Sequence, residues 1–384
     1  MLIPSQRDSF DIPENVAYLN CAYMSPLMRK VAEAGKAGVD LKRQPWSLTP
    51  ADFFSVPDEV RAKCARLIGA EPGDIALIPS ASYGIACAAN NLPIASGQEI
   101  ICLDDQFPSN LYSWRQLASE QGGSVRMITR NDARTDDGDT DWTAALLEAI
   151  SDQTAIVALP HCHWTDGAIV DLVRVGKKAR EYGAALVLDV TQSCGALPIN
   201  MQDVQPDFLI CASYKWLLGP YSTGFLYVAP KWQNGRPLEE GWIARKGSED
   251  FRRLVDYQDE YQPGAMRFDM GERSNFHLLP MMDTALGQLL DWGVKNIAET
   301  LLEKTRYIAG KVVPLGLSSA PENLRANHFL GLQVSGGIPD ALLPALAKEN
   351  IFVSVRGDSI RITPHLYNTD QDADRLVDML KKVL

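Results

Sequence analysis

The first two thirds of the chain alternate between short apolar runs and longer amphipathic stretches. The apolar runs cover residues 74–80, 99–104, 124–129, 154–160, 185–190, 207–213 and 223–230. Runs this short and this continuous are typical of strands that a parallel sheet buries on both faces. Helical spacing of apolar residues follows over 82–92, 109–122 and 171–183, and the last of these ends at Gly183. The alternation predicts an α/β core over about residues 15–255.

The pattern changes after this core. Residues 252–276 are polar and aromatic with few strand signals, so we expect an irregular connection there. Helical spacing returns over 278–293 and 296–313, and alternating apolar residues around the turn 356–359 predict a hairpin over 351–364. A final helix is expected at the end of the chain. The predicted division is an N-terminal segment (1–20), a large α/β domain (21–255), a connection (256–277) and a small α+β domain (278–384).

Composition narrows the classes of function. The chain has 384 residues, 46% of them hydrophobic, and a net charge of −11. An acidic chain repels nucleic acid and anionic membranes, and no apolar run is long enough to span a bilayer. The seven cysteines form no CxxC pair, and the first residues lack a secretory pattern, so we expect a reducing, cytoplasmic location.

A metal site is not expected. His161 and His163 flank Cys162, but on a strand the two histidines would share one face while the cysteine points to the other. No second group of ligand residues follows elsewhere in the chain, so the pattern lacks the four ligands of a structural zinc site.

Candidate chemistry begins with a lysine in an apolar stretch. Lys215 lies in the sequence SYKWLLGP, residues 213–220. One interpretation is that its stem packs on the neighbouring aromatic rings while its amine reaches water. Alternatively, a desolvated lysine has a lowered pKa and can form a Schiff base. Asp189 ends the apolar run 185–190; it could cap a helix, or it could face a cationic ligand group at the same rim of the sheet as Lys215.

The order of these residues resembles a known family. A strand ending in Asp-x-x-Gln (Asp189 and Gln192), followed by Ser-x-Lys before Gly-Pro, is similar to the class V aminotransferases, which are pyridoxal-phosphate enzymes of fold type I. The resemblance runs from residues 18–27 to residues 360–369. It implies a large domain with a mostly parallel central sheet flanked by helices, a smaller α+β C-terminal domain, and pyridoxal 5′-phosphate as cofactor.

The resemblance also implies roles for single residues. Lys215 would form the Schiff base, Asp189 would pair with the pyridine nitrogen, and Gln192 would donate a hydrogen bond to the phenolic oxygen of the ring. Phe107 would stack on the ring, although a lone phenylalanine also fits a core position. The phosphate would contact the residues of the strand–helix turn and those preceding the lysine: Ala81, Ser82, Ser213 and Tyr214. From the residues alone, the turn 79–84 also fits an ordinary helix N-cap.

The resemblance also implies roles for two further pairs of residues. Trp242 and Asn275 match positions that reach the phosphate of the neighbouring subunit in kynureninase-like relatives, which implies a homodimer with shared sites. Taken alone, Trp242 also fits a surface aromatic on a polar loop. Arg361 matches the arginine that holds the α-carboxylate of an amino acid substrate, with Arg356 as the second choice. A surface salt bridge is the alternative for either arginine.

The expected reaction is transamination or related chemistry at the α-carbon. A kynureninase-like or C–S β-lyase activity, or epimerisation, is the alternative on the same scaffold. Cysteine desulfurase chemistry is disfavoured because residues 351–361 contain no cysteine, and Asn110 stands where kynureninases carry an aspartate. Outside enzymes, a cofactor-binding sensor module is the alternative. A nicotinamide enzyme is disfavoured because no GxGxxG follows an early strand.

Overall fold

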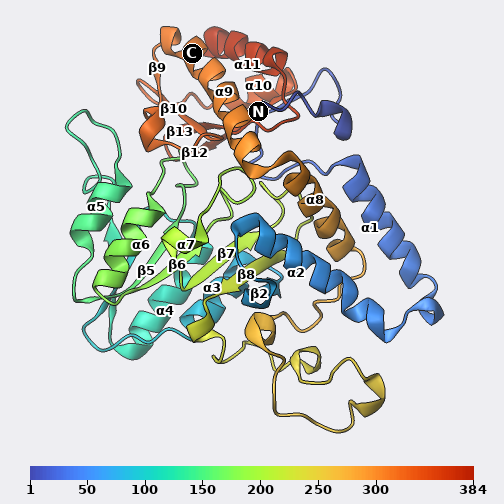
Figure 1. Ribbon diagram of the computed structural model, residues 1–384. Helices are drawn as coiled ribbons and strands as arrows, with labels where there is room; N and C mark the ends of the chain where they lie inside the picture. Colours follow the sequence, from blue (N-terminus) through green and yellow to red (C-terminus); the bar gives the residue numbers. More distant parts are fainter.

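A seven-stranded sheet forms the centre of the large domain in the computed structural model, which describes residues 1–384 (Figure 1). Its strand order is β2-β8-β7-β6-β5-β3-β4, and β8 alone runs antiparallel to its neighbours. The strands are β2 (Ile75–Ile78), β3 (Glu99–Leu103), β4 (Ser124–Ile128), β5 (Thr154–Pro160), β6 (Ala185–Asp189), β7 (Phe208–Ala212) and β8 (Gly224–Val228). Each of the seven predicted apolar runs therefore forms one strand, and the mostly parallel sheet is confirmed.

Helices cover both faces of this sheet, which explains why its strands are apolar at consecutive positions. Ile101 and Leu103 pack in one hydrophobic cluster with helices α2, α5 and α6, whereas Ile100 and Cys102 pack in a second cluster with α3 and α4. The helices of this part of the chain are α1 (Arg29–Lys42), α2 (Ser55–Ile68), α3 (Ala81–Ala89), α4 (Tyr112–Gln121), α5 (Trp142–Ala149), α6 (Leu172–Glu181) and α7 (Met201–Val204).

The C-terminal part of the chain builds a separate sheet with its own core. Four antiparallel strands pair in the order β12-β13-β10-β9: β9 (Leu317–Ser318), β10 (Leu330–Val334), β12 (Ser354–Arg356) and β13 (Ser359–Ile362). Helices α9 (Val294–Val312), α10 (Leu342–Lys348) and α11 (Asp370–Val383) pack on it. The predicted hairpin is present as β12–β13, and β11 (Ile351–Phe352) pairs instead with β1 (Ala17–Tyr18) near the N-terminus.

Helix α8 (Leu278–Trp292) connects the two parts. It packs against α1 and α2, and its buried residues belong to the hydrophobic cluster of the large domain, although the predicted division places residue 278 at the start of the small one. The preceding segment 256–277 contains the short 3-10 helix Gly264–Phe268 and no α-helix.

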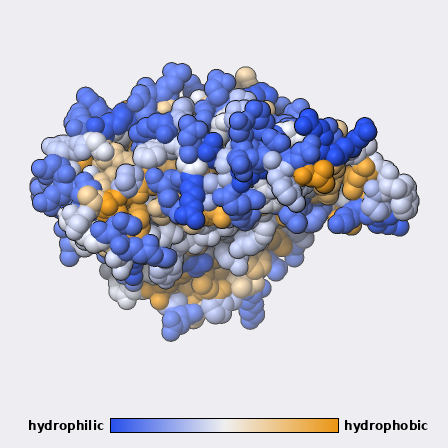
Figure 2. All heavy atoms as spheres, turned by 90° about the horizontal axis from the view of Figure 1, so that it is seen from below, coloured by the Kyte–Doolittle hydropathy of each residue, from blue (hydrophilic) through white to orange (hydrophobic).

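The surface seen from below is mostly hydrophilic, with hydrophobic residues in a few separate patches (Figure 2). No helix combines the length and the hydropathy needed to cross a membrane.

Candidate active site

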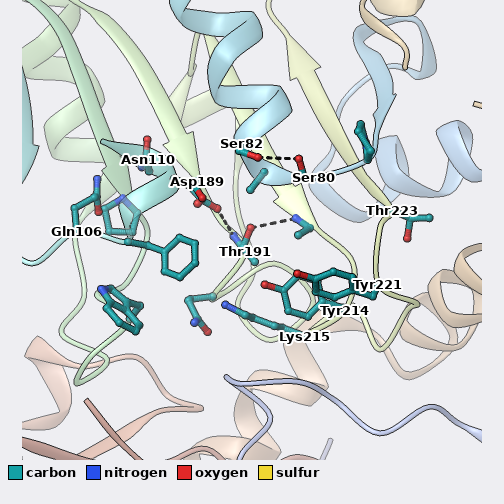
Figure 3. A pocket seen from close by; sticks show the side chains of 18 of the residues that line it. Ser80, Ser82, Gln106, Asn110, Asp189, Thr191, Tyr214, Lys215, Tyr221 and Thr223 are labelled. Atoms are coloured by element: carbon teal, nitrogen blue, oxygen red, sulfur yellow. Dashed lines mark hydrogen bonds between the residues drawn. The ribbon is translucent and has the colours of Figure 1, made fainter. Parts of the chain in front are cut away.

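A cavity of about 220 Å³ opens at the carboxyl edge of the large sheet, where the parallel strands β5, β6 and β7 end. Because β8 runs antiparallel, its first residues reach the same edge. The predicted residues that line the cavity are Ala81, Ser82, Phe107, Asp189, Gln192, Tyr214 and Lys215. These positions lie between residues 81 and 215 of the chain, and the strand order brings them into one space (Figure 3).

Lys215 extends into this cavity from the turn that follows β7 (Figure 3). It is 6% exposed, and its Nζ lies 5.4 Å from the ring centroid of Phe107 and 5.5 Å from that of Tyr214. Burial lowers the pKa of Lys215 to about 8, although Asp189 opposes this shift. The amine is thus closer to its neutral, nucleophilic form at pH 7 than an exposed lysine, as the Schiff-base interpretation expects.

Asp189 ends β6 and is buried at the same edge. Its Oδ1 accepts a hydrogen bond from the backbone N–H of Thr191 at 3.0 Å. Burial raises the pKa of Asp189, while the bonds from Thr191 and the charge of Lys215 oppose the rise. Asp189 forms no ion pair within the chain, and its carboxylate lines the cavity, where it can interact with a cationic group.

The start of α3 forms another wall. Ser80 caps this helix by accepting a hydrogen bond from the backbone N–H of Tyr83, and its hydroxyl lies 2.9 Å from that of Ser82. Ala81 and Ser82 thus occupy the first helical turn, whose N–H groups and dipole favour an anion. The ring centroids of Tyr214 and Tyr221 lie 4.6 Å apart on the facing side of the cavity, with the ring planes tilted by 54° (Figure 3).

Phe107 borders the cavity together with an indole ring. Its ring meets that of Trp164 edge to face at 5.5 Å. Asn110 is fully buried beside them, and its Oδ1 accepts a hydrogen bond from Trp114 while its Nδ2 has no partner. The amide nitrogen of Asn110 is therefore a buried donor in the wall of the cavity.

Ser213 does not line the cavity, unlike its neighbour Tyr214. Its hydroxyl donates to the carbonyl oxygen of Pro220 at 2.6 Å and lies 2.5 Å from Oγ1 of Thr223. The side chain therefore closes the turn that carries Lys215, and its hydroxyl is already engaged within the protein.

Arg361 approaches the site from the small domain. It is 1% exposed, its Nε donates to Ser354, and its Nη1 donates to the backbone oxygen of Trp164 at 2.8 Å. No carboxylate pairs with it, and burial lowers its pKa to about 9, with a further contribution from Arg356. The guanidinium carbons of both arginines lie within 6 Å of the Trp164 ring centroid, at 5.8 Å for Arg361 and 5.9 Å for Arg356.

Trp242 and Asn275 lie away from the cavity but close to each other. Both line a separate surface depression beside α1 and the aromatic ring of Phe53. Trp242 is 42% exposed, and Asn275 accepts a hydrogen bond from the backbone N–H of Leu278 at the start of α8. Within one chain, neither residue reaches the space around Lys215.

Several cavity residues were not identified from the sequence. Trp164 follows the His-Cys-His stretch directly, Thr191 lies between Asp189 and Gln192, and Thr223 follows the lysine turn. Adjacency to a predicted strand end was the available signal for each. The structure adds that Ser222, which lines the cavity, adopts a left-handed conformation with φ of +65°.

The cavity fits the expected cofactor in the chemistry of its groups. It presents a desolvated amine to bind an aldehyde, a buried carboxylate for a basic ring nitrogen, and a capped helix start for a phosphate. The unpartnered Nδ2 of Asn110 is a further polar group suited to a polar ligand. The residues present therefore fit pyridoxal phosphate.

Comparison with known proteins agrees with this chemistry. An uncharacterised aminotransferase of Bacillus subtilis, YcbU, is 26% identical, and the aligned region covers 83% of this chain and 81% of that protein. Isopenicillin N epimerase of Streptomyces clavuligerus is 24% identical over 95% of this chain and 94% of that one. Among solved structures, an apo cysteine desulfurase from Thermococcus onnurineus superposes with a TM-score of 0.85 at 20% identity, covering 100% of this chain and 99% of that chain.

The family itself is shown by sequence over most of the chain. The Aminotransferase class-V family matches residues 49–376, which include Lys215, Asp189 and Arg361. This match, together with the fold shared with the cysteine desulfurase, establishes that the chain belongs to the class V aminotransferases and is a pyridoxal-phosphate-dependent enzyme of fold type I.

Proposed function

We propose that this enzyme transfers the amino group of an amino acid substrate by chemistry at the α-carbon, with Lys215 as the catalytic residue. The observation that carries the proposal is the amine of Lys215, which is buried in the cavity beside Asp189 and has a pKa lowered to about 8. Pyridoxal phosphate, when bound, supplies an aldehyde that captures amines and a ring that withdraws electrons from the substrate α-carbon.

The residues of the chain have distinct parts in this proposal. Lys215 would bind the cofactor aldehyde and would move a proton at the substrate α-carbon. Asp189 would hold a proton on the ring nitrogen, and Phe107 would pack on the ring. Ala81, Ser82 and Tyr214 would contact the phosphate. The hydroxyl of Ser213 donates to Pro220 within the turn, so Ser213 would contribute by holding the turn that carries Lys215.

Substrate binding is assigned to Arg361. A buried guanidinium without a carboxylate partner is costly, and a substrate carboxylate would relieve that cost with paired hydrogen bonds. Arg356 lies on the neighbouring strand, and its side chain is less buried, which makes it the second choice. Both arginines face Trp164, which lines the cavity.

We further propose a homodimer in which Trp242 and Asn275 complete the phosphate site of the partner. This accounts for their shared position outside the cavity of their own chain. The Nδ2 of Asn275 remains available because its Oδ1 accepts the hydrogen bonds at the start of α8.

A β-lyase is the second candidate. Tyr214 precedes the lysine as in kynureninases, and a kynureninase of Deinococcus radiodurans is 27% identical over 81% of this chain. Cysteine desulfurase chemistry is disfavoured because all seven cysteines are buried. Burial raises the thiol pKa of Cys162, the cysteine that lines the cavity, so it lacks thiolate character.

A panel of amino acids offered without a keto acid tests the proposal. Transamination predicts one equivalent of pyridoxamine phosphate and one of keto acid per site, and no reaction for the Lys215→Ala variant. Continuous release of ammonia with pyruvate, or of alanine from a β-substituted substrate, would establish the lyase instead. Loss of optical rotation would establish an epimerase, and binding without any turnover would favour the sensor module.

A further inference from the structure

The side-chain amide of Gln192 is held in one orientation by two partners. Its Oε1 accepts a hydrogen bond from the indole Nε1 of Trp216 at 3.2 Å, and its Nε2 donates to the backbone oxygen of Ala22 at 3.2 Å. An indole N–H can only donate and a carbonyl oxygen can only accept, so the opposite orientation of the amide would face each partner with the wrong group. One N–H of Nε2 remains for the cavity that Gln192 lines.

Trp216 is itself fixed in place. It is fully buried, it follows Lys215 directly, and its ring meets that of His328 edge to face at 4.2 Å. The turn after Gln192 approaches its backbone closely: at Gly195, which has φ of +95°, a Cβ atom would lie 2.5 Å from the Trp216 carbonyl oxygen. The turns that carry Gln192 and Lys215 are therefore packed against each other with no room for adjustment.

His328 holds the backbone of the same glutamine. Its Nε2 lies 2.6 Å from the carbonyl oxygen of Gln192, which can only accept, so Nε2 carries the proton. Burial lowers the pKa of His328 to about 3, which keeps the ring neutral. Trp216 and His328 therefore act on the side chain and on the backbone of Gln192, respectively.

We propose that Trp216 is a positioning residue, which keeps the free N–H of Gln192 directed at the phenolic oxygen of the bound cofactor. The inference rests on the proposed function of Gln192 at that oxygen. Without the indole donor, only the carbonyl oxygen of Ala22 holds the amide, so orientations that turn the amide oxygen toward the ring oxygen, where the two repel, become more populated. A hydrogen bond to that oxygen lowers its basicity, and with it the pH at which the cofactor–lysine linkage loses its proton.

The test is a pH titration of the visible absorption band of the holoenzyme. Trp216→Phe should raise the midpoint by about one pH unit, the effect expected for losing a hydrogen bond to a charged oxygen. Gln192→Ala should raise it by a similar amount. Because both changes remove the same contact, the double variant should show no more than the larger single shift. Trp232→Phe is the matched control: it loses an indole hydrogen bond to Asp207, which precedes β7 at the opposite end of that strand from the cavity.

Several results would overturn the proposal. An unshifted midpoint in Trp216→Phe, or shifts that add in the double variant, would show that Trp216 does not act through Gln192. A wild type that acquires no visible band with pyridoxal phosphate would refute the proposed function as well. If Trp216→Phe does not fold, the residue can be replaced by benzothienylalanine, which keeps the ring shape and removes only the N–H; the same midpoint shift is then expected.

Discussion

At the scale of single residues, Lys215 combines burial with a nearby carboxylate. Burial lowers its pKa to about 8, and Asp189 raises it against this trend. A pKa near 8 in place of 10.5 increases the neutral fraction of the amine at pH 7 by about 300-fold. Burial in the cavity is thus the main reason why the amine of Lys215 is more reactive at neutral pH than that of an exposed lysine.

This predicts the pH dependence of cofactor capture. The rate at which the apoenzyme captures pyridoxal phosphate should rise with pH and level off above about 8, because only the neutral amine attacks the aldehyde. Stopped-flow absorbance measures this rate. Lys304→Met is the matched control, since Lys304 is also largely buried but donates to Asn368 beside α11. A midpoint near 10.5 would contradict the desolvated amine.

Asp189→Asn should move that midpoint in a known direction. The carboxylate stabilises the ammonium form of Lys215, so its removal should lower the lysine pKa further below 8. The same titration of capture rate measures the shift, with reconstituted cofactor content as a second readout. A midpoint that rises or stays fixed would mean that Asp189 does not act electrostatically on the lysine.

At the scale of elements, the phosphate-side wall depends on how closely α3 packs on the sheet. At Gly84 a Cβ atom would lie 2.8 Å from Cγ1 of Ile210 and 3.0 Å from Cδ1 of Ile78. Strands β2 and β7 therefore meet the helix backbone almost directly, and this contact sets the position of Ser80 and Ser82 at the helix start.

Gly84→Ala should lower the free energy of unfolding by about 1–3 kcal/mol through overpacking, and should weaken the binding of pyridoxal phosphate by displacing α3. Urea unfolding and equilibrium dialysis measure the two effects. Gly310→Ala is the control, because Gly310 is exposed in α9 with no atom near the added methyl group. It should stabilise the protein by up to about 1 kcal/mol. Equal effects of the two substitutions would argue against the tight contact.

Elements with one strong local signal were predictable from the sequence. Six of the seven strands of the large sheet are buried at nearly every position, so each of these appears as an apolar run; the edge strand β4 is only partly buried. The hairpin β12–β13 has an unambiguous turn. Helices α1 and α2 were not predicted. The buried residues of α1 are Val31, Gly35 and Gly38, where glycines admit the neighbouring helix and leave little apolar periodicity to detect.

The site was predictable where a residue lies next to a strand end, and less so where a distant segment supplies the contact. Asp189 and Lys215 follow strands directly. The contact between Arg361 and Trp164 joins residues 197 positions apart, and no local pattern indicates such a pairing. The inward orientation of Ser213 is likewise a property of the folded turn, since its hydroxyl bonds to Pro220.

At the scale of the whole molecule, the proposed dimer explains why Trp242 and Asn275 lie outside the cavity. In such a dimer, each active site contains residues from both chains. A symmetric dimer places two such sites across one two-fold axis, and each site would take its lysine from one chain and its Asn275 from the other.

Subunit complementation tests this arrangement. Lys215→Ala and Asn275→Asp should each be nearly inactive; the aspartate retains the oxygen that caps α8 but repels a phosphate. Random mixing yields half heterodimers with one intact site each, so activity should return to about a quarter of wild type. Light scattering gives the oligomeric state of each sample. Mixtures that remain inactive would contradict shared sites.

The most direct test of the account is to reduce the holoenzyme with borohydride and map the modified peptide by mass spectrometry. The account predicts one phosphopyridoxyl group per chain, on Lys215, because its amine is the desolvated lysine in the cavity beside Asp189. A label on another lysine, or no label after incubation with pyridoxal phosphate, would contradict it.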